Sequence, residues 1–156
     1  MTKFSDRIKK SAKTSPIILA NDYDSKTPNI ESKTLRNIKF LNNYLCGIKI
    51  NFHLLLQLDK KQISKINKTA HDSGLQCIAD IKLNDIGNTN EITTKTLWNL
   101  GFDAVIVNPI MGIESLKKIV SSAHKQDKGV IVLCHMSAPE AKISYDMNVK
   151  SPNNSK

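Results

Sequence analysis

The sequence predicts an α/β protein built around a parallel sheet, and two observations support this prediction. Short segments rich in Ile and Val recur along the chain at intervals of about thirty residues, as expected for strands buried on both faces. Amphipathic helical stretches separate these segments. The expected strands span residues 17–20, 46–50, 76–81, 104–107 and 130–134.

The expected helices are placed by the spacing of their apolar residues. A helix is predicted over 63–70, where apolar residues recur on one face and Gly74 follows at the position of a C-terminal cap. Two further stretches share this pattern: 93–100, closed by Gly101, and 113–123. Residues 4–12 could form another helix that covers one end of the sheet.

Strand followed by helix, repeated along the chain, predicts parallel pairing through right-handed crossovers. Periodicity alone fits both a small doubly wound sheet and a (β/α)8 barrel. A barrel typically takes about 250 residues, so a chain of 156 residues would hold an incomplete one. We expect one domain over residues 1–150, followed by a polar tail over 151–156.

Composition favours an ordinary globular protein. Hydrophobic residues make up 40% of the chain, and no apolar run approaches the roughly 18 residues of a membrane helix. The first fifteen residues lack the apolar core of a signal peptide, so a cytoplasmic location is expected. The net charge of +9 comes mostly from lysines spread along the chain, with Arg7 and Arg36 as its arginines. This pattern predicts a solvated surface rather than nucleic-acid recognition.

The cysteines and histidines show no metal-binding pattern. Cys46, Cys77 and Cys134 are odd in number, and each lies in or beside an apolar segment. We therefore expect reduced, buried thiols and no metal site. His135 is expected to be a packing residue, whereas His53 and His71 are expected at the surface.

Charged residues stand at the ends of the predicted strands, where parallel α/β proteins bind ligands. The five are Asp22, Lys49, Asp80, Lys82 and Asp85. Side chains two apart on a strand share a face, so Asp80 and Lys82 should project together, and Lys49 and Asp85 could join them. Charges inside apolar strands are costly to bury unless they are paired. The cluster is thus a candidate active site; a buried ion-pair network, or charges that reach solvent, would also fit.

Asp-x-Lys-x-x-Asp-Ile over residues 80–86 resembles the signature of orotidine 5'-phosphate decarboxylases. Further segments resemble the same family in order along the chain: 17–22 with Asp22, 47–50 with Lys49, 89–91, and 136–139 with Ser137. The resemblance runs from about residue 16 to residue 141. It implies a TIM-barrel type (β/α)8 fold, of which this chain would hold about five βα units.

The sequence also departs from the family pattern. Asn51 stands where the family usually has glycine, and Gly87 stands where it usually has proline. After the fourth strand, Asn108 and Pro109 replace a common His-Gly pair. Strands six to eight, with the arginine that holds the substrate phosphate, are absent from the 156 residues. None of these departures removes a charged position of the motif.

The resemblance implies a lyase that decarboxylates orotidine 5'-monophosphate to uridine 5'-monophosphate in de novo pyrimidine biosynthesis, without metal or organic cofactor. Lys82 would stabilise the carbanion that forms and then donate a proton to it. Asp80 would lie against the substrate carboxylate, and Lys49 and Asp85 would keep Lys82 protonated and oriented. These four are the expected catalytic residues.

The resemblance also implies substrate contacts and a partner. Asp22 and Lys49 would contact the ribose hydroxyls, and Ser137 would contact the pyrimidine. Asp85, Ile86 and Thr89 would reach the site from the neighbouring subunit of a homodimer, so Asp80 and Asp85 of one site would come from different chains. No nucleic acid or membrane partner is expected.

Two alternatives remain open at this point. One is a magnesium-dependent decarboxylase or aldolase of sugar phosphates on the same barrel, which uses an acidic metal ligand near the second strand. Residues 49–53 contain no carboxylate, and Ile86 after Asp85 also favours the nucleotide enzyme. The other alternative is an inactive barrel fragment that serves as a binding module.

Overall fold

The computed structural model describes residues 3–148 and contains one parallel sheet. Its strands lie in the order β1-β2-β3-β4-β5 and every neighbouring pair is parallel. Their bounds are β1 Ile18–Asn21, β2 Gly47–Asn51, β3 Gln76–Leu83, β4 Ala104–Val107 and β5 Gly129–Val132. The predicted parallel pairing is confirmed. Two boundaries were wrong by two residues: β3 continues to Leu83, and β5 ends at Val132 rather than at residue 134.

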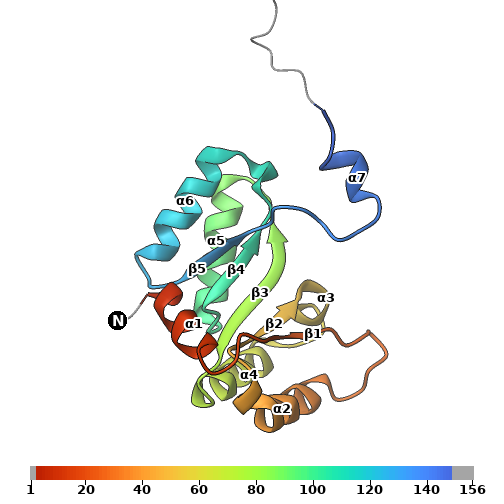
Figure 1. Ribbon diagram of the computed structural model, residues 1–156, viewed down its shortest axis with the longest axis vertical. Coiled ribbons are helices and arrows are strands. Elements are labelled where there is room, and N and C mark those ends of the chain that lie inside the picture. Colours follow the sequence, from red (N-terminus) through yellow and green to blue (C-terminus); the bar gives the residue numbers. More distant parts are fainter. Residues whose placement is uncertain (1–2, 149–156) are drawn as a thin grey trace, which may run out of the picture.

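Helices connect successive strands, as the alternating pattern predicts (Figure 1). They are α1 Phe4–Ala12, α2 Ile30–Leu41, α3 Phe52–Leu55, α4 Lys60–Asp72, α5 Gly87–Asn99, α6 Ile113–His124 and α7 Ala141–Ser144, with short 3-10 turns η1 Asn42–Tyr44 and η2 Pro109–Met111. The expected glycine ending of α4 is confirmed, because Gly74 has φ +78° and its amide bonds the carbonyl of His71. No helix was predicted over the residues of α2.

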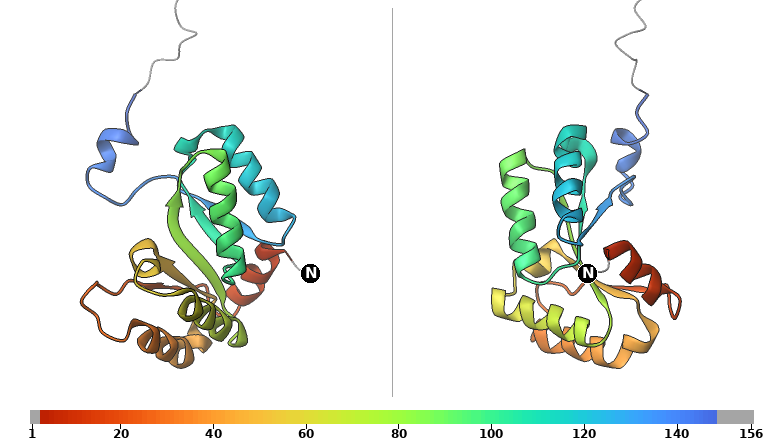
Figure 2. Two further views of the ribbon diagram at one scale, coloured as in Figure 1. Left: turned by 180° about the vertical axis from the view of Figure 1, so that it is seen from behind. Right: turned by 90° about the vertical axis from the view of Figure 1, so that its left-hand side faces the viewer.

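The helices cover one face of the sheet and leave the other face open. Seen from behind, the green α5 and cyan α6 lie in front of the strands (Figure 2, left). Ile48, Ile50 and Val105 point toward this helical layer and are fully buried. Lys49 lies between two of these residues along β2, so its side chain projects from the opposite face. The open face is therefore where the polar residues of the strands meet.

Helix α1 lies at the amino end of the sheet, as expected for residues 4–12 (Figure 1). Arg7 links it to the starts of three strands by contacting Gln76, Asp103 and the carbonyl of Asp127. Burial of Asp103 raises its pKa, but hydrogen bonds from His71 and the Cys77 amide, with nearby positive charge, outweigh burial and leave that pKa lowered. An ionised Asp103 thus joins α1 to the sheet.

The sheet has two edges, at β1 and at β5, so the barrel is not closed within the described residues. Apolar side chains remain accessible along both edges: Ile18 on β1 is 40% exposed and Val132 on β5 is 44% exposed. Closing a (β/α)8 barrel requires strands that pair with these edges.

Cys134 is an exposed free thiol, so its predicted burial was wrong. It lies beyond the end of β5, where the chain has left the sheet. The predicted burial of Cys46 and Cys77 is confirmed, and both are free thiols. Among the described residues, no helix has the length and hydropathy that a bilayer crossing requires. The predicted tail 151–156 lies outside the described residues.

Candidate active site

Lys49 on β2 and Asp80 on the neighbouring strand β3 form an ion pair on the open face of the sheet. Asp80 is the register partner of Asn51 on β2, and Lys49 lies two residues before Asn51 on the same face. The ammonium nitrogen of Lys49 lies 2.7 Å from Asp80 Oδ2. Asp80 is 6% exposed, and burial at this depth requires such a partner.

Lys82 completes the cluster from a distorted part of β3. Its Nζ lies 2.8 Å from Asp80 Oδ1, so the two carboxylate oxygens each hold one lysine. The register between β3 and β4 shifts between Ala79 and Leu83, and Lys82 has φ +47°. A left-handed conformation is unfavourable for a residue with a side chain, and such strain is concentrated at functional sites. The strand is thus bent where Lys82 turns toward Asp80.

Lys49, Asp80 and Lys82 alternate in sign and are called here the charge array. Burial is the largest single influence on the pKa of Asp80 and raises it. Hydrogen bonds from Lys49 and Lys82, together with their charges, outweigh burial and leave the pKa of Asp80 below its ordinary value of 3.8. The array therefore contains one carboxylate and two ammonium groups, with a net charge of +1. It can attract an anion and can supply a proton from a lysine.

Asp85 does not join the array within this chain. The hydrogen bond that its carboxylate makes is local, since Oδ1 accepts a 2.7 Å bond from the Ile86 amide. Its backbone is held by the buried Asn90, whose side chain bonds both the amide and the carbonyl of Asp85. Ile86 is 73% exposed, and Thr89 is half-buried at the first turn of α5. This segment therefore presents Asp85 and Ile86 outward from a fixed loop.

The remaining expected site residues lie in exposed positions around the open carboxyl end of the sheet. Asp22 follows β1 directly and is exposed, whereas its neighbour Asn21 is buried and bonds Thr34 on α2. Ser137 is exposed in the segment that follows β5. His135, expected to be a packing residue, is also exposed, although its ring lies 5.0 Å from that of Tyr145.

Sequence reasoning missed two asparagines that organise the site. Asn51 Oδ1 accepts a 2.6 Å hydrogen bond from Lys49 Nζ, and Asn90 fixes the backbone of Asp85. Asn51 was noted only as a departure from the family pattern. The signal for Asn90 was its place five residues after Asp85 at the start of a helix, where Asn often bonds nearby backbone.

One group of described residues has the composition of a metal site, at the amino end of the sheet. Ligand atoms of His71, Cys77 and Asp103 lie within 4.8 Å of one another. Asp103 already pairs with Arg7 at 3.1 Å, and Lys128 lies 3.9 Å away. Burial, and then the charge of Asp103, raise the pKa of the Cys77 thiol well above its ordinary value. Since metals bind the thiolate, the group fits an ion-pair network better. His71 is exposed, as expected, although its ring takes part in this network.

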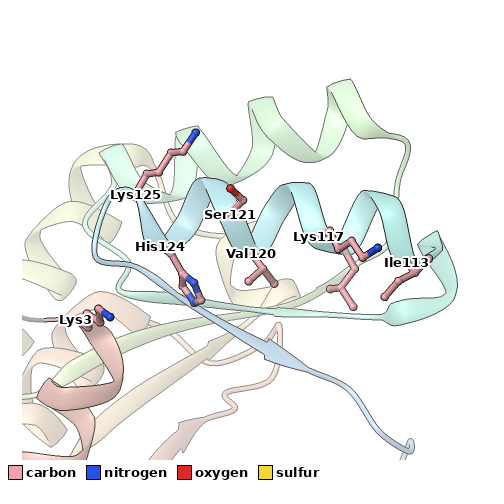
Figure 3. Close-up of a pocket in the computed structure, with 8 residues that line it drawn as sticks. Lys3, Ile113, Lys117, Val120, Ser121, His124 and Lys125 are labelled. Carbon is pink, nitrogen blue, oxygen red and sulfur yellow. The ribbon is translucent and has the colours of Figure 1, made fainter.

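Two hollows formed by described residues lie away from the array. One of about 720 Å³ runs along α6, where Ile113, Val120 and His124 line it (Figure 3). Another, of about 360 Å³, is lined by residues 84–87, which include Asp85 and Ile86, and by Met111 and Ser115. The array itself stands on the open face of the sheet, where only one wall of a barrel interior is present.

Comparison with known proteins decides the family. Residues 15–153 match the family described as Orotidine 5'-phosphate decarboxylase / HUMPS family. The chain belongs to this family. Among curated relatives, the orotidine 5'-phosphate decarboxylase of Methanosphaera stadtmanae is 37% identical over 125 residues, which is 80% of this chain and 54% of the relative. That of Pyrococcus abyssi is 31% identical over 126 residues, with the same shares.

Solved structures agree with this assignment. Orotidine 5'-monophosphate decarboxylase from Methanocaldococcus jannaschii superposes with a TM-score of 0.71 and 27% identity, covering 85% of this chain and 60% of that one. UMP synthase from Leishmania donovani gives 0.85 at 22% identity, covering 96% of this chain and 34% of that one, and shows the shared fold. The chain thus has the α/β fold of these barrels and spans about half the length of its curated relatives.

Proposed function

We propose that this chain provides the catalytic half of an orotidine 5'-monophosphate decarboxylase. The observation that carries the proposal is the charge array, in which Asp80 lies between Lys49 and Lys82 at the carboxyl ends of β2 and β3. The similarity to curated decarboxylases supports it, because the chain matches them over the segment that contains the array. Strands beyond β5 are required to complete the barrel and to hold the substrate phosphate.

In the proposed reaction the bond between the pyrimidine ring and its carboxylate breaks, and CO2 leaves. The electron pair stays on the ring carbon as a carbanion, which needs a positive neighbour and then a proton. Lys82 would supply the positive charge and the proton, because its side chain stands at the open end of the array and is 41% exposed. Asp80 would face the substrate carboxylate and disfavour the bound substrate relative to the transition state.

Lys49 would maintain the ionised state of Asp80 and contact the ribose, together with Asp22. Ser137 would contact the pyrimidine from the segment after β5. We further propose that the enzyme is a homodimer in which Asp85, Ile86 and Thr89 act in the partner's site. The outward position of the fixed Asp85 loop supports this arrangement, because the hydrogen bonds of Asp85 are local and do not reach the array of its own chain. No metal or organic cofactor enters the proposed mechanism.

Replacement of Lys82 tests the proposal. The assay uses this chain completed with strands six to eight, joined for example from the Methanosphaera stadtmanae relative. The Lys82→Ala variant should lose decarboxylation by a factor of at least about 100, because the proton donor is lost. Unfolding should change little, since the Lys82 side chain is partly exposed and Asp80 keeps its ion pair with Lys49.

Lys68→Ala is the matched control, because Lys68 is an exposed lysine paired only with Asp72 on α4. Its turnover should equal that of the completed parent. Near-normal turnover in the Lys82→Ala variant would show that Lys82 is not the catalytic acid.

A further inference from the structure

Asn51 ends β2 beside the charge array, and its side chain has an unusual partner. Asparagine is a preferred residue at a helix N-terminus, where its oxygen accepts a hydrogen bond from a backbone amide. Asn51 occupies that position before α3, yet its side chain makes no capping bond. Its Oδ1 accepts a 2.6 Å hydrogen bond from Lys49 Nζ. The side chain that could cap α3 holds the lysine instead.

We infer that Asn51 is a positioning residue that fixes the ammonium group of Lys49 for an anionic ligand; the ligand part rests on the proposed function. An ammonium has three N–H donors. Within residues 3–148, Lys49 directs two of them to Asn51 and Asp80. Because the donors diverge tetrahedrally, these two bonds fix the direction of the third. The third donor is left for a ligand on the open face.

The neutrality of the Asn51 amide preserves the charge of the array. Lys49, Asp80 and Lys82 together carry +1. An aspartate at position 51 would fill nearly the same volume and accept the same hydrogen bond, but it would reduce the net charge to zero. Asn51 therefore combines two properties that substitution can separate: order of the lysine and attraction for an anion.

Competitive labelling of amines, read by mass spectrometry, measures the order of Lys49 in the dilute 156-residue chain and the attraction for an anion in the completed protein. Lys49 should react slowly in the parent, because two acceptors hold its ammonium. In Asn51→Ala its labelling should rise roughly tenfold, as expected when a charge-assisted hydrogen bond is lost. In Asn51→Asp it should stay as slow as in the parent or become slower. Asn42→Ala is the matched control. It removes the hydrogen bond that the Asn42 side chain in η1 donates to the Lys39 carbonyl of α2, and it should leave the labelling of Lys49 unchanged.

The second readout is protection of Lys49 from labelling by orotidine 5'-monophosphate, measured in the chain completed with strands six to eight because those strands would hold the substrate phosphate. The parent should be protected and Asn51→Asp should not, although its Lys49 remains ordered. An absence of protection in the parent would contradict the ligand part of the inference and the proposed function. The acceleration in Asn51→Ala tests the positioning role independently of any ligand.

Lys128, which is half-buried at the amino end of the sheet, reports whether a variant keeps its fold. If Asn51→Ala also accelerates the labelling of Lys128, that variant has lost its fold. The labelling of Lys49 in the isosteric Asn51→Asp variant then decides whether Asn51 holds the lysine. Equal labelling of Lys49 in Asn51→Ala and the parent, with Lys128 unchanged, would overturn the inference. Faster labelling of Lys49 in Asn51→Asp would also overturn it.

Discussion

Replacing Asp103 with alanine should destabilise the chain through loss of the network at the amino end of the sheet. Asp103 Oδ2 lies 2.7 Å from the His71 ring and accepts a 2.9 Å hydrogen bond from the Cys77 amide, while Oδ1 accepts a 3.1 Å bond from Arg7. The substitution leaves the buried Cys77 amide without this acceptor and removes the charge that balances Arg7 and Lys128.

The expected loss is about 3 kcal/mol in the free energy of unfolding. Removing one partner of a buried ion pair costs roughly 3–5 kcal/mol, and an unsatisfied buried amide alone costs about 1–3 kcal/mol. We take the lower end because Arg7, His71 and Lys128 retain 25%, 37% and 19% exposure and can regain water. Asp103→Asn keeps an acceptor for the Cys77 amide, so it should lose about half as much.

Urea unfolding at low protein concentration measures this loss, with the fluorescence of Trp98 as the signal. Trp98 is the single tryptophan of the chain and is buried. Asp72→Ala is the matched control, since Asp72 pairs with Lys68 on the exposed face of α4 and should cost less than about 0.5 kcal/mol. A loss below about 1 kcal/mol for Asp103→Ala would refute the reasoning, because the network would then contribute no more than surface pairs do.

The pH dependence of the same measurement has a defined sign. The pKa of Asp103 is lowered in the folded chain from its ordinary value of 3.8. Its ionised form therefore adds stability that is fully present above pH 3.8 and is lost as pH falls through the lower folded value. The difference between the parent and Asp103→Asn should shrink in that acidic range. An unchanged difference would mean that the charge of Asp103 contributes nothing.

Two further predictions concern assembly. If Asp85 acts in the partner's site, mixing completed Asp85→Ala and Asp80→Ala chains should restore about one active site per heterodimer; no rescue in a sample shown to contain heterodimers would favour a site within one chain. The 156 residues alone should associate with rising concentration through the β1 and β5 edges and show little or no turnover, because binding energy from the phosphate supports the chemical step. This prediction would be contradicted if light scattering showed that the chain stays monomeric and a decarboxylation assay showed turnover at a rate like that of the completed protein.

The strand pattern could be predicted from sequence because it depends on local periodicity. All five strands, the helix at residues 4–12 and the glycine ending of α4 were predicted. The end of β5 was misplaced because residues 133–134 continue its apolar composition past Val132, the last residue of the strand, and the burial of Cys134 was wrong for the same reason. Apolar composition does not show where pairing stops.

The array was partly predictable, because alternation along β3 places Asp80 and Lys82 on one face. The contact of Lys49 with Asp80 depends on the register between β2 and β3, which local sequence does not specify. The left-handed conformation of Lys82 was not predictable either, since nothing in its residue type favours φ +47°. The role of Asp103 likewise depends on contacts between distant segments, whereas Asn51 lies two residues from Lys49 on the same face of β2.

The most direct test of the central claim is decarboxylation of orotidine 5'-monophosphate by the completed protein in excess EDTA. We predict release of CO2 and formation of uridine 5'-monophosphate at a rate that added Mg²⁺ does not change, because the proposed mechanism relies on the lysine ammonium groups of the array. Turnover that disappears in EDTA and returns with Mg²⁺, or activity only on sugar phosphates, would contradict the assignment and favour the metal-dependent relatives.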